Sequence, residues 1–160
     1  DALPNNKFAL IIPSLPNVQF FLQTFSMPTI NVKEVEVATR YVDYNEIGEK
    51  LNFEPFTVTF LVDKYCRNWN SIYDWMKKMT VDGSNVGFSE DLTLLSDGKE
   101  LLKFIGSWPT ALSGFDLDAT IPAHKYVVGS VTFNYDYMDY LGEFASSDSS
   151  YNRPMKTSVM

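Results

Sequence analysis

The sequence contains one cysteine, Cys66, and one histidine, His124, and this scarcity removes several classes of site. A single cysteine cannot form an intramolecular disulfide or a cysteine-based zinc site, and one histidine cannot build a histidine-rich metal centre. Cys66 is better explained as a buried or half-buried thiol than as a nucleophile, because only one histidine exists to activate it. His124 follows a proline in a predicted loop, where a surface or half-buried histidine is the simplest interpretation.

Positive charge and long apolar runs are also scarce. The 13 basic and 20 acidic residues give a net charge of −7, which argues against a protein that reads nucleic-acid sequence. An acidic protein surface would still allow a polyanion to pass along it, because it would repel the polyanion and not bind it. No apolar run approaches the roughly 18 residues that span a bilayer, so we expect no membrane insertion by this chain. The first residues lack the layout of a signal peptide, and a soluble, reducing compartment is expected.

Short apolar or alternating stretches predict six or seven β-strands. The clearest are Lys7–Pro13, Val18–Ser26, Val35–Tyr41, Phe56–Val62, Leu92–Ile105 and Lys125–Tyr137. Asp97-Gly98 divides the fifth stretch, and this pair favours a tight hairpin turn because it tolerates positive φ.

One convincing helix is predicted over Asn68–Met79. Its aromatic and apolar side chains recur at helical spacing and predict a core-facing stripe, formed by Trp69, Ile72, Tyr73, Met76 and Met79. One helix among many short strands predicts a mainly β protein, an antiparallel β-sandwich or barrel with one flanking α-helix.

Val42–Pro55 is predicted to be a long polar loop with no clear core face. The segment and the residue before it carry apolar side chains that the alternating core does not accommodate: Tyr41, Tyr44, Ile47, Leu51 and Phe53. Apolar side chains on a long loop are costly to expose together, so we expect them to bury against another subunit. These five residues are the predicted self-assembly site.

Nothing in the sequence resembles an assembled active site, and no catalytic, metal or cofactor site is predicted. Asp116 and Asp118 would share a face of an extended segment, but two carboxylates supply too few oxygen ligands for a metal, so surface charges are the simpler interpretation. The nine tyrosines and three tryptophans leave a carbohydrate-binding β-sandwich as the alternative from a different class.

Two blocks resemble the tail tube protein family of contractile-tailed bacteriophages. They are "DGKELLKFIGSWPTALSGFDLD" and "SVTFNYDYMDY". In that family a hairpin leads into a strand that ends in Gly-x-Trp-Pro, then an Asp-Leu-Asp step, then a last strand that ends in Tyr-Asp-Tyr. The matching positions here are Gly106, Trp108, Pro109, Asp116, Leu117, Asp118, Tyr135, Asp136 and Tyr137. The resemblance covers about residues 7–140.

The resemblance implies a tail-tube-like β domain over residues 1–140, of the fold shared with the type VI secretion tube, and a flexible or partner-ordered arm over residues 141–160. It implies a virion protein without catalysis, assembled in the host cytoplasm into hexameric rings. Stacked rings would form the inner tail tube, through which DNA passes, in contact with sheath and baseplate proteins. A baseplate tube-initiator ring of the same fold is the alternative, because the family usually ends soon after the last aromatic strand.

The resemblance also gives a structural explanation for Gly106, Trp108 and Pro109. Proline removes a backbone donor and would end the strand ladder, and Trp108 would then plug the end of the sandwich. These three residues are the predicted structural corner. In the same family, the insertion that matches Val42–Pro55 reaches the adjacent ring.

Overall fold

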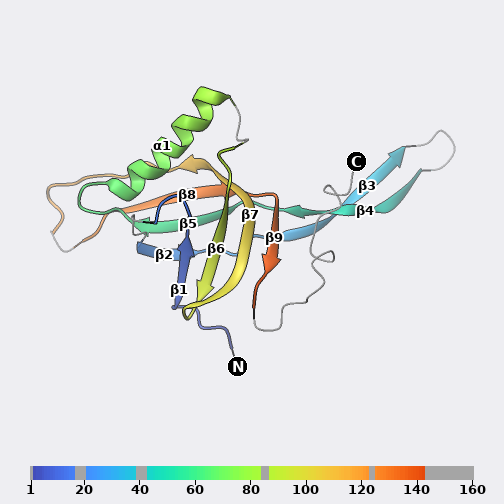
Figure 1. Cartoon of the computed structure of the whole chain (residues 1–160), viewed down its shortest axis with the longest axis horizontal. Coiled ribbons are helices and arrows are strands. Elements are labelled where there is room, and N and C mark those ends of the chain that lie inside the picture. Colours follow the sequence, from blue (N-terminus) through green and yellow to red (C-terminus); the bar gives the residue numbers. More distant parts are fainter. Residues whose placement is uncertain (1, 17–20, 39–42, 84–86, 123–124, 143–160) are drawn as a thin grey trace.

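The computed structural model describes residues 2–16, 21–38, 43–83, 87–122 and 125–142, with the backbone alone for residues 21, 33–38 and 43–50. These residues form one helix and nine antiparallel strands (Figure 1). The bounds are β1 Phe8–Ile11, β2 Phe21–Phe25, β3 Ile30–Ala38, β4 Asp43–Phe53, β5 Phe56–Leu61, α1 Arg67–Asp82, β6 Glu90–Ser96, β7 Lys99–Leu112, β8 Val128–Asn134 and β9 Tyr137–Tyr140. The predicted mainly β class with one helix is confirmed.

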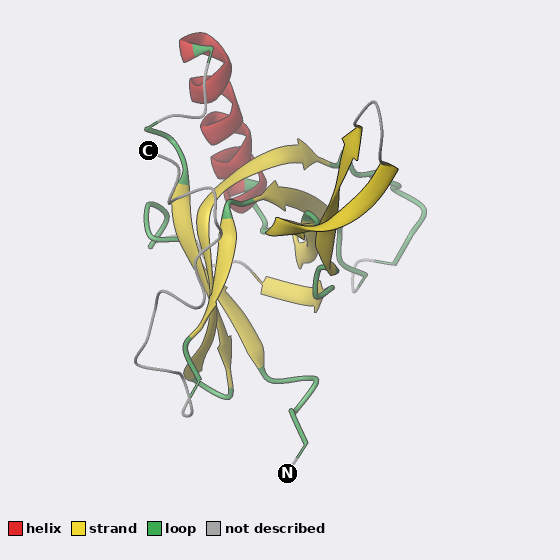
Figure 2. Ribbon diagram, turned by 90° about the vertical axis from the view of Figure 1, so that its right-hand side faces the viewer, coloured by secondary structure: helices red, strands yellow, loops and turns green. Residues whose placement is uncertain are grey.

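The long strand β7 joins two groups of strands into one folded sheet. The order is β1-β6-β7-β8-β5-β2, and β9 pairs with β7 as well. Figures 1 and 2 show β1, β6 and β9 running steeply across β2, β5 and β8, while β7 curves from one group to the other. Strands β3 and β4 form a separate two-stranded sheet.

The core lies between the two groups of strands and beneath α1. Phe56, Val58 and Phe60 of β5 are buried at alternate positions, as their spacing predicts. Phe56 meets Phe104 of β7 with ring centroids 4.4 Å apart, so aromatic packing connects the two groups directly.

The β6–β7 hairpin turns at Asp97-Gly98, as predicted. Both residues have positive φ, 52° and 79°, which is the requirement of a type I′ turn. Asparagine, aspartate and glycine adopt this conformation at the lowest cost, so the local sequence favours this turn. The register of the hairpin then shifts between Leu94 and Leu95.

Helix α1 starts after a left-handed residue, Cys66, with φ of 60°. Asp63 Oδ1 accepts hydrogen bonds from the backbone N–H groups of Tyr65 (3.1 Å) and Arg67 (2.7 Å), which satisfies donors at the helix start. The helix ends at Gly83, also left-handed, whose N–H donates to the Met79 carbonyl. It therefore runs slightly beyond the predicted range at both ends.

The core face of α1 differs from the predicted stripe at two positions. Ile72 is fully buried, but Tyr73 is 44% exposed, and the buried aromatic is Trp75. The Trp75 indole N–H donates to the Phe88 carbonyl over 2.6 Å, so its polar edge is satisfied within the core. Trp75, and not Tyr73, is therefore the aromatic that α1 buries in the core beside Ile72.

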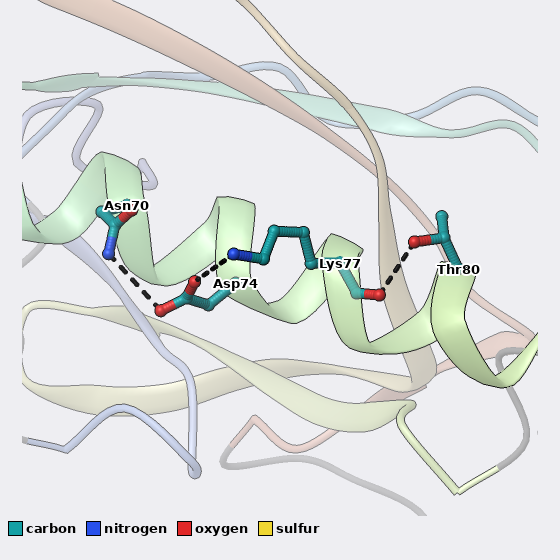
Figure 3. Close-up of polar contacts among 4 residues, drawn as sticks. All are labelled: Asn70, Asp74, Lys77 and Thr80. Carbon is teal, nitrogen blue, oxygen red and sulfur yellow. Dashed lines mark hydrogen bonds and ion pairs between the residues drawn. The ribbon is translucent and has the colours of Figure 1, made fainter.

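The outer face of α1 carries a chain of polar contacts (Figure 3). Asn70 Nδ2 donates to Asp74 over 3.4 Å, Lys77 lies 3.8 Å from the same carboxylate, and the Thr80 hydroxyl donates to the Lys77 carbonyl over 2.8 Å. These exposed, local contacts contribute little to stability individually. They mark the face of α1 that points away from the sheet.

The last predicted strand, Lys125–Tyr137, is divided in the structure. β8 faces the core at alternate positions, with Val131, Phe133 and, just beyond the strand, Tyr135 buried. The chain then bends at Asp136, whose N–H donates to the Ile105 carbonyl over 2.8 Å, and continues as β9 along β7.

Candidate assembly surfaces

The segment predicted to be a loop, Val42–Pro55, contains strand β4, so that prediction is wrong. β4 pairs antiparallel with β3 from Ile30↔Phe53 to Ala38↔Asp43, with an irregularity between Val32 and Glu34. The sequence concealed this strand because polar residues occupy both faces, which removes the alternation that marks a half-buried strand. The backbone pairing is nevertheless regular over most of the hairpin.

The β3–β4 hairpin stands apart from the rest of the fold. It projects from one end of the molecule, at the right of Figure 1, and forms no ladder with the seven-stranded sheet. An isolated two-stranded hairpin is at best marginally stable in water. A projecting hairpin of this length is therefore the element that most needs a partner.

The hairpin base carries apolar side chains that face water. Ile30 is 37% exposed, Val32 56% and Leu51 46%, and Met27 just before the hairpin is 50% exposed. Ile30 pairs with Phe53 and Val32 with Leu51 in the register, so these side chains lie on adjoining positions of one surface. This surface is called the hairpin base below.

The structure distributes the five predicted self-assembly residues among different environments. Leu51 is exposed, as such a role requires, whereas Phe53 is half-buried and packs on Tyr135 with ring centroids 5.7 Å apart. The idea that Phe53 has no place in the core is corrected. Tyr44 and Ile47 lie in β4 opposite Val37 and Glu34, and Tyr41 lies outside the described residues.

The predicted corner lies inside β7 rather than at its end. Residues up to Ser107 pair with β6 or β9, and residues from Trp108 onward pair with β8. Gly106 has φ of 67°, and its N–H donates to Asp91 Oδ1 over 3.0 Å. The strand thus bends at the glycine and changes partners without ending.

Two expectations about the corner need correction. Pro109 does not end the ladder, because β7 continues to Leu112, although the register shifts after Pro109, where its missing donor makes an irregularity cheap. Trp108 does not plug the core, because it is only half-buried, while Ser107 and Pro109 are fully buried.

Asp116 and Asp118 lie in the loop after β7, not in a strand, and both are exposed. Asp118 Oδ1 accepts hydrogen bonds from the Thr120 hydroxyl (2.6 Å) and the Thr120 N–H (2.9 Å). These bonds lower the pKa of Asp118 because they stabilise its charged form. Within the described part of the chain, no three His, Cys, Asp or Glu side chains gather as a metal site would require.

The same loop borders a surface hollow of about 640 Å³. Its lining combines two carboxylates, one lysine and several apolar side chains: Phe115, Asp116, Leu117, Asp118, Ala119, Ile121, Pro122, Lys125, Tyr126, Val127 and Val128. This surface is called the loop hollow below. No feature of the sequence predicted it, because the hollow depends on how the loop returns to β8.

Of the two residues considered for nucleophilic chemistry, only Cys66 belongs to the described residues. Cys66 is half-buried at the start of α1, and burial, with a smaller contribution from Asp63, raises the pKa of its thiol. A raised pKa reduces the thiolate population and argues against a nucleophile. His124 lies outside the described residues.

Sequence reasoning missed Asn68, which is fully buried. Its Nδ2 donates to the Leu61 carbonyl over 2.8 Å, and its Oδ1 accepts from the N–H groups of Trp69 (2.9 Å) and Asp63 (3.2 Å). The side chain therefore connects the end of β5 to the start of α1. The signal in the sequence was the position of Asn68, a polar residue directly before the apolar stripe of the helix, where side chains often cap a helix.

Cryo-EM structures of contractile injection systems contain chains with the same fold. A chain of the anti-feeding prophage cap, the tube terminating cap, superposes with a TM-score of 0.57 at 17% identity over 88% of this chain and 91% of that chain. A chain of the sheath/tube terminator of the PVC extracellular contractile injection system gives 0.57 at 16% identity, covering 89% and 98%. The PVC sheath-tube complex gives 0.55 at 15% identity, covering 88% and 93%.

This chain has the fold of contractile-injection tube proteins. The similarity spans nearly the whole of each chain compared, so the fold is shared as a unit and not through a common hairpin or sheet. No protein-family model matches the sequence, and no curated protein is similar to it in sequence. The evidence for the tube-like fold therefore comes from the structure and from the tail-tube motifs, and not from overall sequence similarity.

Proposed function

We propose that this chain is a structural subunit of a contractile tail-like particle, in which it forms hexameric rings that stack into the inner tube. The observation that carries the proposal is the match, over about nine-tenths of each chain, to tube and terminator assemblies. The projecting β3–β4 hairpin supports it independently, because an unsupported hairpin with an apolar base needs a neighbouring subunit.

In this proposal the tube is a conduit with an acidic character. The net charge of −7 suits a channel that DNA or another polyanion passes without adhering. The partners are further copies of the chain, together with sheath and baseplate proteins. The particle is a phage-type tail assembled in the host cytoplasm, and the flexible or partner-ordered arm expected over residues 141–160 lies outside the described residues from position 143 onward.

A terminal ring of the same fold is the second candidate. Two of the three similar structures are described as a tube terminating cap and a sheath/tube terminator, and their TM-scores equal or exceed that of the sheath-tube complex. A terminal or baseplate ring would use one stacking surface and leave the other for a different protein. A repeating subunit would use both.

Negative-stain electron microscopy of the purified chain distinguishes these roles. Stacked rings forming tubes support the repeating subunit, and single or paired rings that never extend support a terminal or baseplate ring. A protein that stays monomeric and binds sugars on a glycan array would instead be the carbohydrate-binding module, with exposed tyrosines such as Tyr65 and Tyr126 as its platform. That result would contradict the proposal.

The proposed role requires no catalysis, and the similar structures are assemblies of structural proteins. Within the described residues no helix is both long and apolar enough to cross a membrane.

A further inference from the structure

The connection between β5 and α1 carries two cations beside an exposed aromatic ring. Tyr65 is 69% exposed, and its ring centroid lies 5.5 Å from Lys64 Nζ and 5.3 Å from Arg67 Cζ. Attraction between the cations and the ring holds the three side chains together. The Asp63 carboxylate fixes the backbone beneath them, because it accepts from the N–H groups of Tyr65 and Arg67. Lys64, Tyr65 and Arg67 are called the basic cluster below.

The loop hollow has the opposite charge and a largely apolar lining. Leu117 is 78% exposed and Tyr126 75% exposed, and both line the hollow. Asp116 and Asp118 lie in the same lining with a single cation, Lys125, so its net charge is negative. An exposed apolar patch with a polar rim is typical of an interaction site.

The basic cluster and the loop hollow lie side by side. The Val62 N–H donates to the Val127 carbonyl over 2.8 Å, and the Trp69 indole N–H donates to the Ser113 carbonyl over 2.8 Å. The segment that carries the cluster is therefore bonded to both ends of the loop that forms the hollow. Figure 1 shows the start of α1 and the loop between β7 and β8 at the same, left end of the molecule. Both surfaces are built before a partner arrives, which lowers the cost of binding.

The charges of both surfaces are free to meet a partner. Among the described residues, the ion pairs are Lys7–Asp97 and Lys77–Asp74, and neither involves the cluster or the hollow. Copies with a net charge of −7 repel one another, so a contact between them needs cations placed opposite carboxylates. The basic cluster supplies those cations, and the hollow supplies the carboxylates. A second copy of this chain is therefore a partner with the matching chemistry.

We propose that two copies meet through this end, with the basic cluster of each copy seated in the loop hollow of the other. Lys64 and Arg67 then face the two aspartates, and the Tyr65 ring lies on the apolar lining. Because cluster and hollow are neighbours on one end, each copy donates and receives, and the contact is reciprocal about a two-fold axis. Such a contact closes after two copies. It goes beyond the proposed stacking of rings, which continues along a line, and it joins two rings or two tubes where this end is free.

Exchanging the charges tests the contact. Lys64→Glu with Arg67→Glu, or Asp116→Lys with Asp118→Lys, places like charges together and should weaken pairing about tenfold or more in sedimentation velocity. An equal mixture of the two variants restores opposite charges in both halves of the contact. The mixture should pair like the wild type, which a misfolded variant could not do.

Each variant has a control with the same change in net charge. Lys78→Glu with Lys99→Glu matches the cluster variant, and Asp82→Lys with Glu100→Lys matches the hollow variant. All four control positions are exposed and lie outside both surfaces. The controls should pair like the wild type, and an equal loss in variants and controls would mean that net charge, and not this contact, governs pairing.

Sedimentation detects pairing whether the unit that pairs is one chain or a ring, so the inference and the tube proposal fail separately. A wild type that does not pair, exchanged variants that pair normally, or a mixture as defective as its components would overturn the inference. Rings or tubes in the electron microscope would then still support the tube proposal. Single chains that pair as expected but never form rings would support the inference and contradict the tube proposal.

Discussion

Gly106 meets two separate requirements at the bend of β7. Its φ of 67° is a conformation that other residues adopt only with strain, and a Cβ built on it would lie 2.5 Å from Asp136 Oδ2. Gly106→Ala should therefore lower the free energy of unfolding by about 2–4 kcal/mol, measured by chemical denaturation.

Gly98→Ala is the matched control, because Gly98 has a similar φ of 79° but nothing within 4 Å of its built Cβ. Only the backbone strain applies there, about 1–2 kcal/mol. Equal losses at the two positions would show that contact with Asp136 contributes nothing at the bend.

Tyr135 buries its hydroxyl oxygen without a hydrogen-bond partner in the described structure. Burial, with a further contribution from Glu54, raises the pKa of Tyr135 to about 12 from the usual 10. Because the folded state holds the proton more tightly than the unfolded state, this group's contribution to stability is complete below pH 10 and is lost as the pH rises toward 12.

Tyr135→Phe should be neutral or stabilising at pH 7, because it removes an unsatisfied buried oxygen without changing the ring. Its unfolding free energy should also fall less steeply than that of the wild type between pH 10 and pH 12. Tyr65→Phe, at a position 69% exposed, provides the control and should follow the wild-type curve. If the unfolding free energy of Tyr135→Phe falls with pH as steeply as that of the wild type, other groups cause the loss of stability at alkaline pH.

At the scale of elements, α1 offers two neighbouring positions with opposite expectations. Ile72→Ala should cost about 2–5 kcal/mol, since the side chain is fully buried against the sheet. Tyr73→Ala should cost less than about 1 kcal/mol, since the ring is 44% exposed. Thermal or urea unfolding measures both, and a reversed order would mean that the helix is rotated from its described position.

The β3–β4 hairpin is expected to serve assembly and not the fold of the domain. Glu34 and Ile47 are paired in the register, so replacing residues 35–46 with Asn-Gly closes a shorter hairpin with a favourable turn. The shortened chain should keep the circular dichroism and melting behaviour of the wild type but should not stack. Loss of folding would show that the hairpin supports the domain, and unchanged stacking would remove it from the assembly surface.

The elements that the sequence predicts well are those with a local physical cause. β5 alternates cleanly, and Asp97-Gly98 satisfies a turn that needs two positive φ values, so both follow from neighbouring residues. β4 has polar residues on both faces, so its pairing with β3 leaves no periodic signal.

The corner and the loop hollow depend on long-range placement. The sequence predicts that Gly106 and Pro109 mark a change in the strand. It does not predict that β7 continues through both residues, nor that its pairing partners change there from β6 and β9 to β8. Phe115 and Tyr126 both line the hollow because the loop returns to β8. The spacing of these residues in the sequence does not predict that arrangement.

At the scale of the whole molecule, two groups of exposed apolar side chains lie at opposite ends. The hairpin base exposes Met27, Val32 and Leu51, and the loop hollow exposes Leu117 and Tyr126. Surfaces at opposite ends that are each incomplete alone suit a subunit that repeats along a line or around a ring. The tube-like fold and these two surfaces therefore lead to the same expectation.

Native mass spectrometry of the purified chain, combined with electron-microscopic class averages, tests the central claim most directly. The account predicts assemblies in multiples of six copies of the 18.2 kDa chain, with six-fold symmetric rings around an open centre. A protein that remains monomeric across the concentration range, or that forms closed two-fold dimers without a central opening, would contradict it.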